Sequence, residues 1–383
     1  MTLLKKNINL FLTQATLCLG LFSTAVPSQA QNIGKTNSVT NLRSVQFERL
    51  CFQRSVACTD IGKAAHLSSA LIYQLFDTER TGNKTKRSNV INQIKRLYGA
   101  KQIDVINKRM KLSDFFLIRK EQDKIFGGYA VLIRQPEVGQ FGKRKVSYAI
   151  AFKGTYVGLE DPNDLAAISS GVPVNMYRRA AALIHEGFRN YAGQVFNDIK
   201  SKELLVEILS LQKQANTEVE ILVTGHSLGA ASILYTAMLV DAGVLPSNIR
   251  TIVFGAPAFT QPSFANRYRT AIANTTRVET KGDFFIYQQR GYMQPIYNTL
   301  GYVPLGNLIA AEPTEKLKEL WQERDILEQQ YQASQSPKIK SAYLDLTKRI
   351  ILEQANIHVK SYGYFYEYYL RTQGPNLTRS GSR

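Results

Sequence analysis

The residues best suited to chemistry lie in the stretch Gly225-His-Ser-Leu-Gly229, which follows a short apolar run and precedes an apolar helical pattern. A strand, a sharp turn and a helix in this order present a serine at the apex of the turn, where it can act as a nucleophile. A Cβ two residues to either side of the apex would collide there, and Gly225 and Gly229 avoid that collision. The pattern therefore predicts a nucleophile elbow around Ser227.

Such a serine needs two further groups, an imidazole that takes its proton and a carboxylate that fixes the tautomer of the imidazole. Histidine is scarce, because the chain has only His66, His185, His226 and His358. Acidic residues are more numerous, so the partner of the histidine must be identified by where each acid lies in the predicted strands and helices. An acid at the carboxyl end of a strand is the expected arrangement.

The elements that must position these groups alternate along the chain. The predicted strands are 129–134, 146–152, 219–224, 250–255 and 276–280, of which the first two form a hairpin. Apolar positions at helical spacing predict helices over 59–76, 90–97, about 176–212, and from the serine to about residue 242. Strands that alternate with helices indicate a mainly parallel central sheet with helices on both faces.

Several motifs occur in a fixed order along the chain. They are Phe152-Lys-Gly-Thr155, His185-Glu-Gly-Phe188, Gly225-His-Ser-Leu-Gly229, Phe254-Gly-Ala-Pro257, Arg277-Val278 with Asp283 beyond it, and His358. In this order they resemble the motifs of class 3 (fungal-type) lipases of the α/β-hydrolase superfamily, over roughly residues 130–369. The resemblance implies an α/β-hydrolase fold, a lipid ester as substrate and no cofactor. The few cysteines and histidines, none at the usual ligand spacings, predict no metal site.

In this superfamily the nucleophile, the acid and the base follow one another along the chain. His358 is the one histidine after Ser227 and is therefore the expected base. Asp283 lies just beyond a predicted strand and at the family's spacing from Arg277-Val278. The other acids to weigh are Glu279, nearer mid-strand, Asp241, which ends a helix, and those near Asp325 and Asp345. The predicted catalytic residues are Ser227, Asp283 and His358, while His66, His185 and His226 are expected to be structural.

A tetrahedral intermediate needs two donors aimed at its developing oxyanion. One is expected from the backbone N–H of Leu228, at the positive end of the following helix. The resemblance assigns the other to the backbone N–H of Thr155. Lys153 stands where the family more often carries Arg, and a lysine cannot reproduce a bidentate guanidinium contact.

The first 30 residues resemble a secretory signal peptide, with Lys5 and Lys6 before an uncharged stretch and small residues before an expected cleavage after Ala30. The alternative is an uncleaved anchor or a buried helix. In an exported chain, Cys51 and Cys58 most simply form one local disulfide, and two free thiols are the alternative.

Cleavage after Ala30 would leave 46 Lys and Arg against 30 Asp and Glu, a formal charge of +16. A basic exported protein can favour anionic lipid, lipopolysaccharide or nucleic acid. The charges are scattered, however, and no basic motif is interleaved with aromatics as in nucleic-acid readers. A solvated basic surface is therefore expected, with peripheral contact to an anionic membrane as the alternative and no nucleic acid.

Two segments depart from the family pattern. Residues 156–176 carry an apolar face and could form a mobile lid over the serine or a fixed loop packed on the core. Residues 312–356 insert a charged, helix-rich segment that a Ser-Pro break at 336–337 divides into a predicted helical hairpin. The hairpin could pack on the body or form an arm that faces a membrane or a partner.

The predicted organisation is a signal peptide at 1–30, a leader and helical region at 31–125, an α/β-hydrolase domain at 126–370 and a flexible tail at 371–383. The predicted function is that of a secreted or periplasmic serine esterase, a lipase that cleaves acylglycerols through an acyl-enzyme. The alternatives are a phospholipase A1 or lysophospholipase, or a non-catalytic α/β-hydrolase that binds lipid or a partner.

Overall fold

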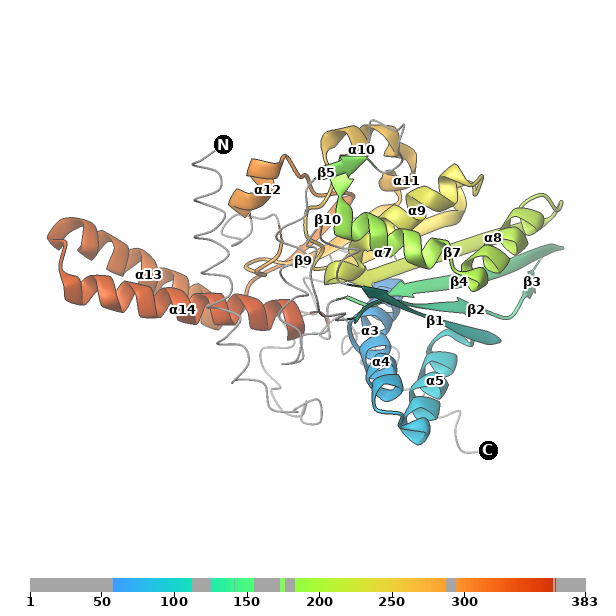
Figure 1. The fold of residues 1–383 in the computed structure, drawn as a ribbon, viewed down its shortest axis with the longest axis horizontal. Coiled ribbons are helices and arrows are strands. Elements are labelled where there is room, and N and C mark those ends of the chain that lie inside the picture. Colours follow the sequence, from blue (N-terminus) through green and yellow to red (C-terminus); the bar gives the residue numbers. More distant parts are fainter. Residues whose placement is uncertain are drawn as a thin grey trace.

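The computed structural model describes residues 58–111, 125–140, 142–154, 173–175, 183–286, 294–360 and 362. An open, mixed sheet runs through its centre in the order β1-β2-β4-β7-β8-β9-β10, and β3 pairs with β4 (Figure 1). The sheet is antiparallel from β1 to β4 and parallel from β4 to β10. This is the α/β-hydrolase architecture that the sequence predicts, with an antiparallel part at one side.

The strands confirm the predicted β-runs and add others. Their bounds are β1 Gln102–Lys111, β2 Ile125–Arg134, β3 Val138–Gln140, β4 Lys143–Phe152, β7 Thr217–His226, β8 Ile249–Phe254, β9 Thr275–Thr280 and β10 Asn307–Ala311. The predicted hairpin is β2 with β4, in a register that sets Ala130 opposite Phe152. The sequence did not predict β1 and β10, the two edge strands, because β1 is rich in polar residues and β10 is short.

Helices cover both faces of the sheet. On one face lie α7 Glu186–Phe196, α8 Ile199–Leu211 and α9 Ser232–Asp241, and on the other lie α3 Cys58–His66, η1 Leu67–Leu71, α4 Ile72–Arg80 and α5 Lys84–Tyr98 (Figure 1). Phe188, Ile208 and Leu234 belong to the apolar core of the first face. Leu71 and Val90 pack with β2 residues such as Val131 on the second. The N-terminal helices are thus part of the core.

The prediction of one helix over 176–212 is wrong. Strand β6 Leu183–His185 pairs with β5 Pro173–Asn175, and a break at residues 197–198 then separates α7 from α8. His185 caps α7 because its Nδ1 accepts the N–H of Gly187 at 3.0 Å. Asp198 caps α8 by accepting the N–H of Lys200 at 2.9 Å. A side chain that satisfies the free N–H groups of a helix start favours a new helix there, and apolar spacing alone does not reveal it.

Short helices complete the body between the parallel strands. They are η3 Ser227–Ala231, η4 Pro246–Asn248, α10 Pro262–Arg267, α11 Arg269–Ala273 and α12 Gln294–Leu300.

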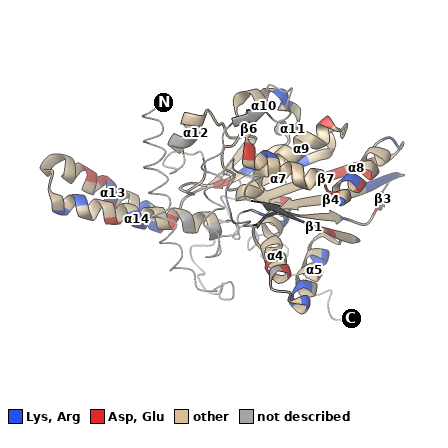
Figure 2. Ribbon diagram, in the orientation of Figure 1, with Lys and Arg blue, Asp and Glu red and all other residues tan. Residues whose placement is uncertain are grey.

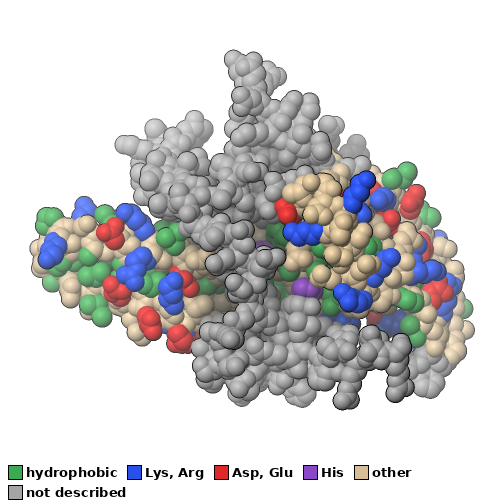
Figure 3. All heavy atoms as spheres, turned by 90° about the horizontal axis from the view of Figure 1, so that it is seen from below, with side chains coloured by type: hydrophobic (Ala, Val, Ile, Leu, Met, Phe, Trp, Pro, Cys, Tyr) green, Lys and Arg blue, Asp and Glu red, His purple; other side chains and the backbone are tan. Residues whose placement is uncertain are grey.

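The inserted segment forms a helical hairpin that projects from the body (Figure 1). It consists of α13 Glu315–Ser334 and α14 Pro337–Lys360, which we call the arm. Its apolar seam includes Leu317, Leu320, Leu346, Ile350 and Ile357. Acidic and basic residues alternate along both of its helices (Figure 2), and on the face seen in Figure 3 their side chains lie among hydrophobic ones. Helix α14 runs past residue 356, so its last turn carries His358.

Several predicted features lie outside the described residues. They are the signal peptide at 1–30, the Cys51 half of the predicted disulfide, Thr155, most of the predicted lid at 156–176, and the tail at 371–383. Of the lid segment, 173–175 form strand β5. Among the described residues, no helix has the length and apolar character needed to cross a membrane. The described part of the chain also holds no cluster of three or more potential metal ligands.

Candidate active site

Ser227 stands at the end of β7, where the chain turns sharply into η3 and then α9. Its φ angle is +57°, in the left-handed region that residues with a side chain rarely adopt. Such a conformation persists only where the surroundings enforce it, and it is typical of functional sites. The serine is also almost fully buried, with 3% of its surface exposed.

The two glycines of the elbow are required by close backbone approach. A Cβ on Gly225 would overlap the carbonyl group of Gly229. A Cβ on Gly229 would overlap the carbonyl oxygen of Phe152, the last residue of β4. The glycines therefore allow the elbow to close on itself and to pack against the end of the neighbouring strand.

Asp283 and His358 lie in contact although 75 residues separate them. The Nδ1 atom of His358 is 2.8 Å from Oδ1 and 2.9 Å from Oδ2 of Asp283. Because a carboxylate only accepts, Nδ1 carries the proton and donates it. In the neutral imidazole Nε2 of His358 is then the acceptor nitrogen, and it has no hydrogen-bond partner among the described residues. A buried imidazole held in this tautomer is suited to act as a base.

Asp283 follows β9 in a tight turn that its backbone N–H closes onto the carbonyl of Thr280. Its Oδ1 also accepts the backbone N–H of Phe285 at 2.9 Å. The carboxylate is fully buried, so hydrogen bonds take the place of water around it. The strand end thus holds Asp283 in one orientation toward His358.

The other acids weighed from the sequence have different partners. Glu279 forms an ion pair with Arg277 inside β9. Asp241 accepts a hydrogen bond of 2.6 Å from the hydroxyl of Tyr268. Asp325 and Asp345 both lie on the arm, where they pair with Arg324 and Lys348, respectively. Of these candidates, Asp283 is the one that contacts His358.

Tyr362 is a site residue that the sequence analysis did not single out. Its hydroxyl donates to Oδ2 of Asp283 at 2.6 Å, and the backbone N–H of Thr280 donates to the same hydroxyl at 3.3 Å. Burial, assisted by the charge of Asp283, raises the pKa of Tyr362 well above its usual value, so it remains a donor. In the sequence Tyr362 begins an aromatic run that reaches Tyr369, and the rest of that run lies outside the described residues.

The region of the predicted oxyanion hole is described in part. Leu228 is the second residue of η3, and N–H groups at a helix start lack partners within the helix. Thr155 lies outside the described residues. Lys153, two residues before it, is buried. Its ammonium donates to the Gly154 carbonyl at 2.8 Å and lies 4.4 Å from the centre of the Phe76 ring. A cation–π contact of this kind stabilises the buried ammonium group.

Tyr191 of α7 binds the backbone around Lys153 from the other face of the sheet. Its hydroxyl lies 2.6 Å from the carbonyl oxygen of Lys153 and 2.7 Å from that of Tyr129. The sequence analysis missed this residue, because it lies within a helical pattern with no separate motif.

The remaining histidines have separate environments. His226 precedes the serine, and both of its ring nitrogens make hydrogen bonds, one of them to the backbone of His358. Burial lowers the pKa of His226 to about 3. His66, at the end of α3, also has its pKa lowered by burial to about 3. His185 serves as the cap of α7. Of the four histidines, His358 is the one whose ring contacts Asp283.

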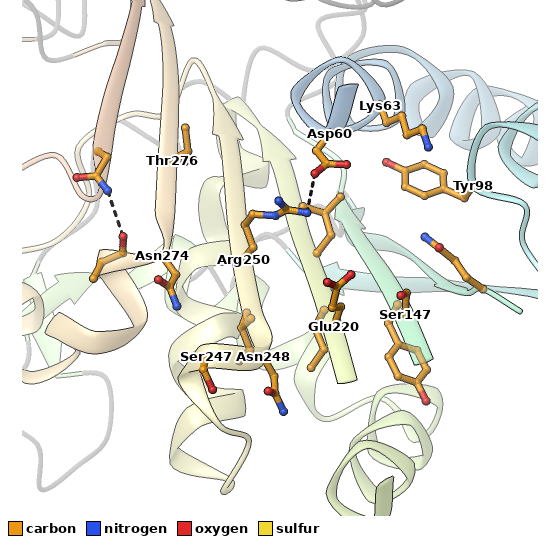
Figure 4. Close-up of a pocket in the computed structure, with 17 residues that line it drawn as sticks. Asp60, Lys63, Tyr98, Ser147, Glu220, Ser247, Asn248, Arg250, Asn274 and Thr276 are labelled. Atoms are coloured by element: carbon orange, nitrogen blue, oxygen red, sulfur yellow. Dashed lines mark hydrogen bonds and ion pairs between the residues drawn. The ribbon is translucent and has the colours of Figure 1, made fainter. Parts of the chain in front are cut away.

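A polar cavity of about 670 Å³ lies at the opposite edge of the sheet (Figure 4). It is lined by residues at the amino ends of β7 to β10 and by Asp60 and Lys63 of α3. Arg250 pairs with Asp60 across it at 2.8 Å. No histidine lines this cavity, so its serines have no base of the kind that His358 offers at the carboxyl ends.

Comparisons with known proteins give one family match and several structural similarities. Residues 149–285 match the family model described as Lipase (class 3). No curated protein sequence matches the chain.

Among solved structures, a deletion mutant of the Rhizomucor miehei lipase propeptide complex is similar at 20% identity and a TM-score of 0.42, with 66% of each chain covered. Lipase II from Rhizopus niveus has 17% identity and a TM-score of 0.44, with 66% of this chain and 80% of that chain covered. Lip2 lipase from Yarrowia lipolytica has 18% identity and a TM-score of 0.37, with 56% and 67% covered.

The family match contains Ser227, Leu228 and Asp283, and it ends before the arm and His358. The resemblance to class 3 lipases that the motifs carry is confirmed over residues 149–285, and the chain is similar to that family there.

Proposed function

We propose that this chain is an exported serine ester hydrolase that cleaves acylglycerol esters through an acyl-enzyme. The observation that carries the proposal is the buried Asp283–His358 pair, in which Nε2 of His358 has no hydrogen-bond partner among the described residues. The backbone of His358 is bound by His226, the residue before the strained Ser227. The family match over residues 149–285 supports a lipase-type ester hydrolase. The chemistry requires no cofactor, because the three side chains and the backbone supply every group.

The first half of the reaction uses Ser227 as nucleophile. Nε2 of His358 takes the proton from Oγ as Oγ attacks the ester carbonyl, and the carbonyl oxygen becomes an oxyanion. The imidazolium then gives this proton to the leaving alcohol oxygen, and the acyl-enzyme remains. Asp283 stabilises the imidazolium and holds Nδ1 protonated throughout.

Two helix ends favour the charges that develop. The oxyanion is expected to accept hydrogen bonds from the backbone N–H of Leu228, at the start of η3, and from the backbone N–H of Thr155. His358 lies in the last turn of the 24-residue helix α14. The carboxyl end of a helix carries partial negative charge and stabilises a nearby cation. The imidazolium thus forms where both Asp283 and the helix favour it.

In the second half, water takes the place of the alcohol. Nε2 removes a proton from the water as its oxygen attacks the acyl carbon, and the tetrahedral intermediate collapses as the proton passes to Oγ of Ser227. The fatty acid leaves and the serine is regenerated.

Hydrolysis of a p-nitrophenyl ester by the purified chain tests the proposal. We expect Ser227→Ala to lower kcat by at least about 10³-fold, because the nucleophile is lost while the fold remains. Circular dichroism and thermal unfolding of both proteins check the fold. Equal rates in the two proteins would rule out the catalytic proposal and leave a protein that binds lipid or a partner.

The basic charge supports a second candidate, a phospholipase A1 or lysophospholipase. The full sequence has a formal charge of +18, which attracts anionic lipid surfaces. Rates on triacylglycerol, phosphatidylcholine and phosphatidylglycerol distinguish the candidates. Preference for triacylglycerol supports the lipase, whereas preference for either phospholipid supports the alternative.

Export is part of the proposal because of the N-terminal pattern. Amino-terminal sequencing of the protein recovered outside the cytoplasm is expected to begin at Gln31, after cleavage at Ala30. An intact Met1 in membrane fractions would support the uncleaved anchor instead.

A further inference from the structure

His226 joins three parts of the molecule that are far apart in the sequence. It is the residue before the proposed nucleophile, and 6% of its surface is exposed. Its Nε2 lies 2.9 Å from the backbone carbonyl oxygen of His358, 132 residues away. Its Nδ1 lies 3.1 Å from the hydroxyl of Tyr73 in α4, 153 residues away.

The chemistry of the partners fixes the proton on His226. A carbonyl oxygen only accepts, so Nε2 must carry the hydrogen that points to His358. Burial keeps the ring neutral at ordinary pH by lowering the pKa of His226 to about 3. Nδ1 of a neutral ring with Nε2 protonated is an acceptor, so the Tyr73 hydroxyl donates to it. Tyr73 therefore selects the one neutral tautomer that can bind the carbonyl of His358.

The carbonyl that His226 binds belongs to the end of a helix. His358 lies within the last turn of α14, which ends at Lys360, and the last four carbonyls of a helix lack partners within it. An unanchored helix end frays readily. The hydrogen bond from His226 satisfies one of these carbonyls at the residue that carries the proposed base.

This contact gives the base a fixed position relative to the nucleophile. Asp283 holds the ring of His358, but it does not hold the backbone that carries the ring. His226 holds that backbone and is covalently joined to Ser227. The two imidazole rings lie 4.8 Å apart between centroids, at an interplanar angle of 34°. The side chain of His226 thus fixes the position of the end of α14 relative to the elbow.

From this geometry we infer that His226 and Tyr73 are positioning residues for the base. His226 anchors the end of α14 beside Ser227, and Tyr73 of the N-terminal helices holds His226 in the tautomer that makes the anchor. Helix α4, which lies outside the family match, therefore contributes to the active site. The inference deepens the proposed function and depends on it only for its kinetic consequences.

A matched pair of substitutions tests the anchor. Methionine and glutamine have similar length, but only glutamine offers a donor near the position of Nε2. We expect His226→Met to lower kcat about 100-fold, the scale of a 1 Å misplacement, with KM within about threefold. His226→Gln should stay within about tenfold of the native kcat. Equal losses in the two variants, or a native rate in His226→Met, would overturn the inference.

Tyr73→Phe tests the tautomer contact through a double-mutant cycle. Alone it should lower kcat about fivefold, the scale of one neutral hydrogen bond. In the His226→Met background it should cause no further loss, because residues that act through one another are not additive. Independent, multiplying losses would contradict the link. Tyr235→Phe, at a buried tyrosine whose hydroxyl donates to Ser201, serves as a control with native kcat.

Hydrogen exchange tests the anchor without any enzymatic activity. In His226→Met, the amides of 355–360 should exchange at least about fivefold faster, and those of 337–350 should not change. In His226→Gln the exchange should be close to native. Unchanged protection in His226→Met would overturn the anchor even in an active enzyme. If Ser227→Ala instead shows that the proposed function is wrong, the exchange data still decide whether His226 holds the helix end.

Discussion

Ser227 and His358 are held in place by different kinds of contact. Ser227 lies in a turn of five consecutive residues, whose two glycines let the backbone close on itself and pack against the end of β4, and its φ is +57°. His358 lies in the last turn of the second helix of an arm that projects from the body. Its position depends on Asp283, on His226 and on the seam between α13 and α14.

The difference indicates where each half of the site is vulnerable. A change outside the elbow leaves the local geometry of Ser227 largely intact, because its constraints are backbone contacts within β7, η3 and the end of β4. The base has few local constraints, so changes in the arm or in the N-terminal helices can displace it. The following predictions test this contrast.

The largest effect is expected where the base meets its acid. In Asp283→Asn the amide can donate to Nδ1, which favours the tautomer with the proton on Nε2 and removes the base. We expect kcat to fall about 10⁴-fold, measured with a p-nitrophenyl ester. Asp241→Asn is the matched control, since Asp241 binds Tyr268 and not a histidine, and its kcat should be native. A small loss in Asp283→Asn would show that Asp283 does not hold the base.

The next effect concerns the arm that carries the base. Leu346 is 2% exposed in the seam, whereas Leu344 on the same helix is 50% exposed. Leu346→Ala should lower the free energy of unfolding by about 2–4 kcal/mol, because it leaves a cavity. Leu344→Ala should change it by less than about 0.5 kcal/mol. Urea unfolding measures both.

The activity of the same two variants relates the arm to the base. Leu346→Ala should also lower kcat several-fold, while Leu344→Ala should keep the native value. An active and stable Leu346→Ala would mean that the base does not depend on the packing of the arm.

The smallest effect is the pH dependence that His226 adds to stability. The unfolded histidine binds a proton near pH 6.5, whereas the folded one stays neutral down to about pH 3. Between these values the unfolded state binds more protons, so the free energy of unfolding falls as the pH falls. The limit is about 1.4 kcal/mol per pH unit for one such group. Stability is not affected by this group above about pH 7.

Comparison with His226→Gln isolates this contribution. Denaturation at pH 7, 6 and 5 should give a shallower decline in the variant than in the native protein. His66 has a pKa lowered in the same direction, and its effect cancels because it is present in both proteins. Parallel declines would show that His226 titrates normally in the folded state.

Much of the architecture follows from local patterns in the sequence. Alternating apolar runs predict β2, β4, β7, β8 and β9, and the Gly225 to Gly229 stretch predicts the elbow because its spacing carries a steric requirement. The small number of histidines and the strand-end position of Asp283 then predict the acid and the base. The roles of these residues remain proposals, but the structure brings Asp283 and His358 into contact.

Other features could not be predicted because they depend on contacts between distant segments. Tyr73, Tyr191 and Tyr362 each make a hydrogen bond at the site through the hydroxyl, and an aromatic residue in an apolar pattern does not reveal which carbonyl, ring or carboxylate that hydroxyl will meet. The caps that divide 176–212 into a strand and two helices likewise act through individual side chains.

The sequence by itself determined the sharp turn around Ser227, because the glycines that its close backbone contacts require lie two residues to either side. Only the tertiary structure decided how His358 reaches that turn, because its ring donates to Asp283 and its backbone carbonyl accepts from His226, and these partners lie 75 and 132 residues away in the sequence. A periodic pattern specifies a helix and its apolar face, but the place where the helix ends in space depends on the groups it meets there.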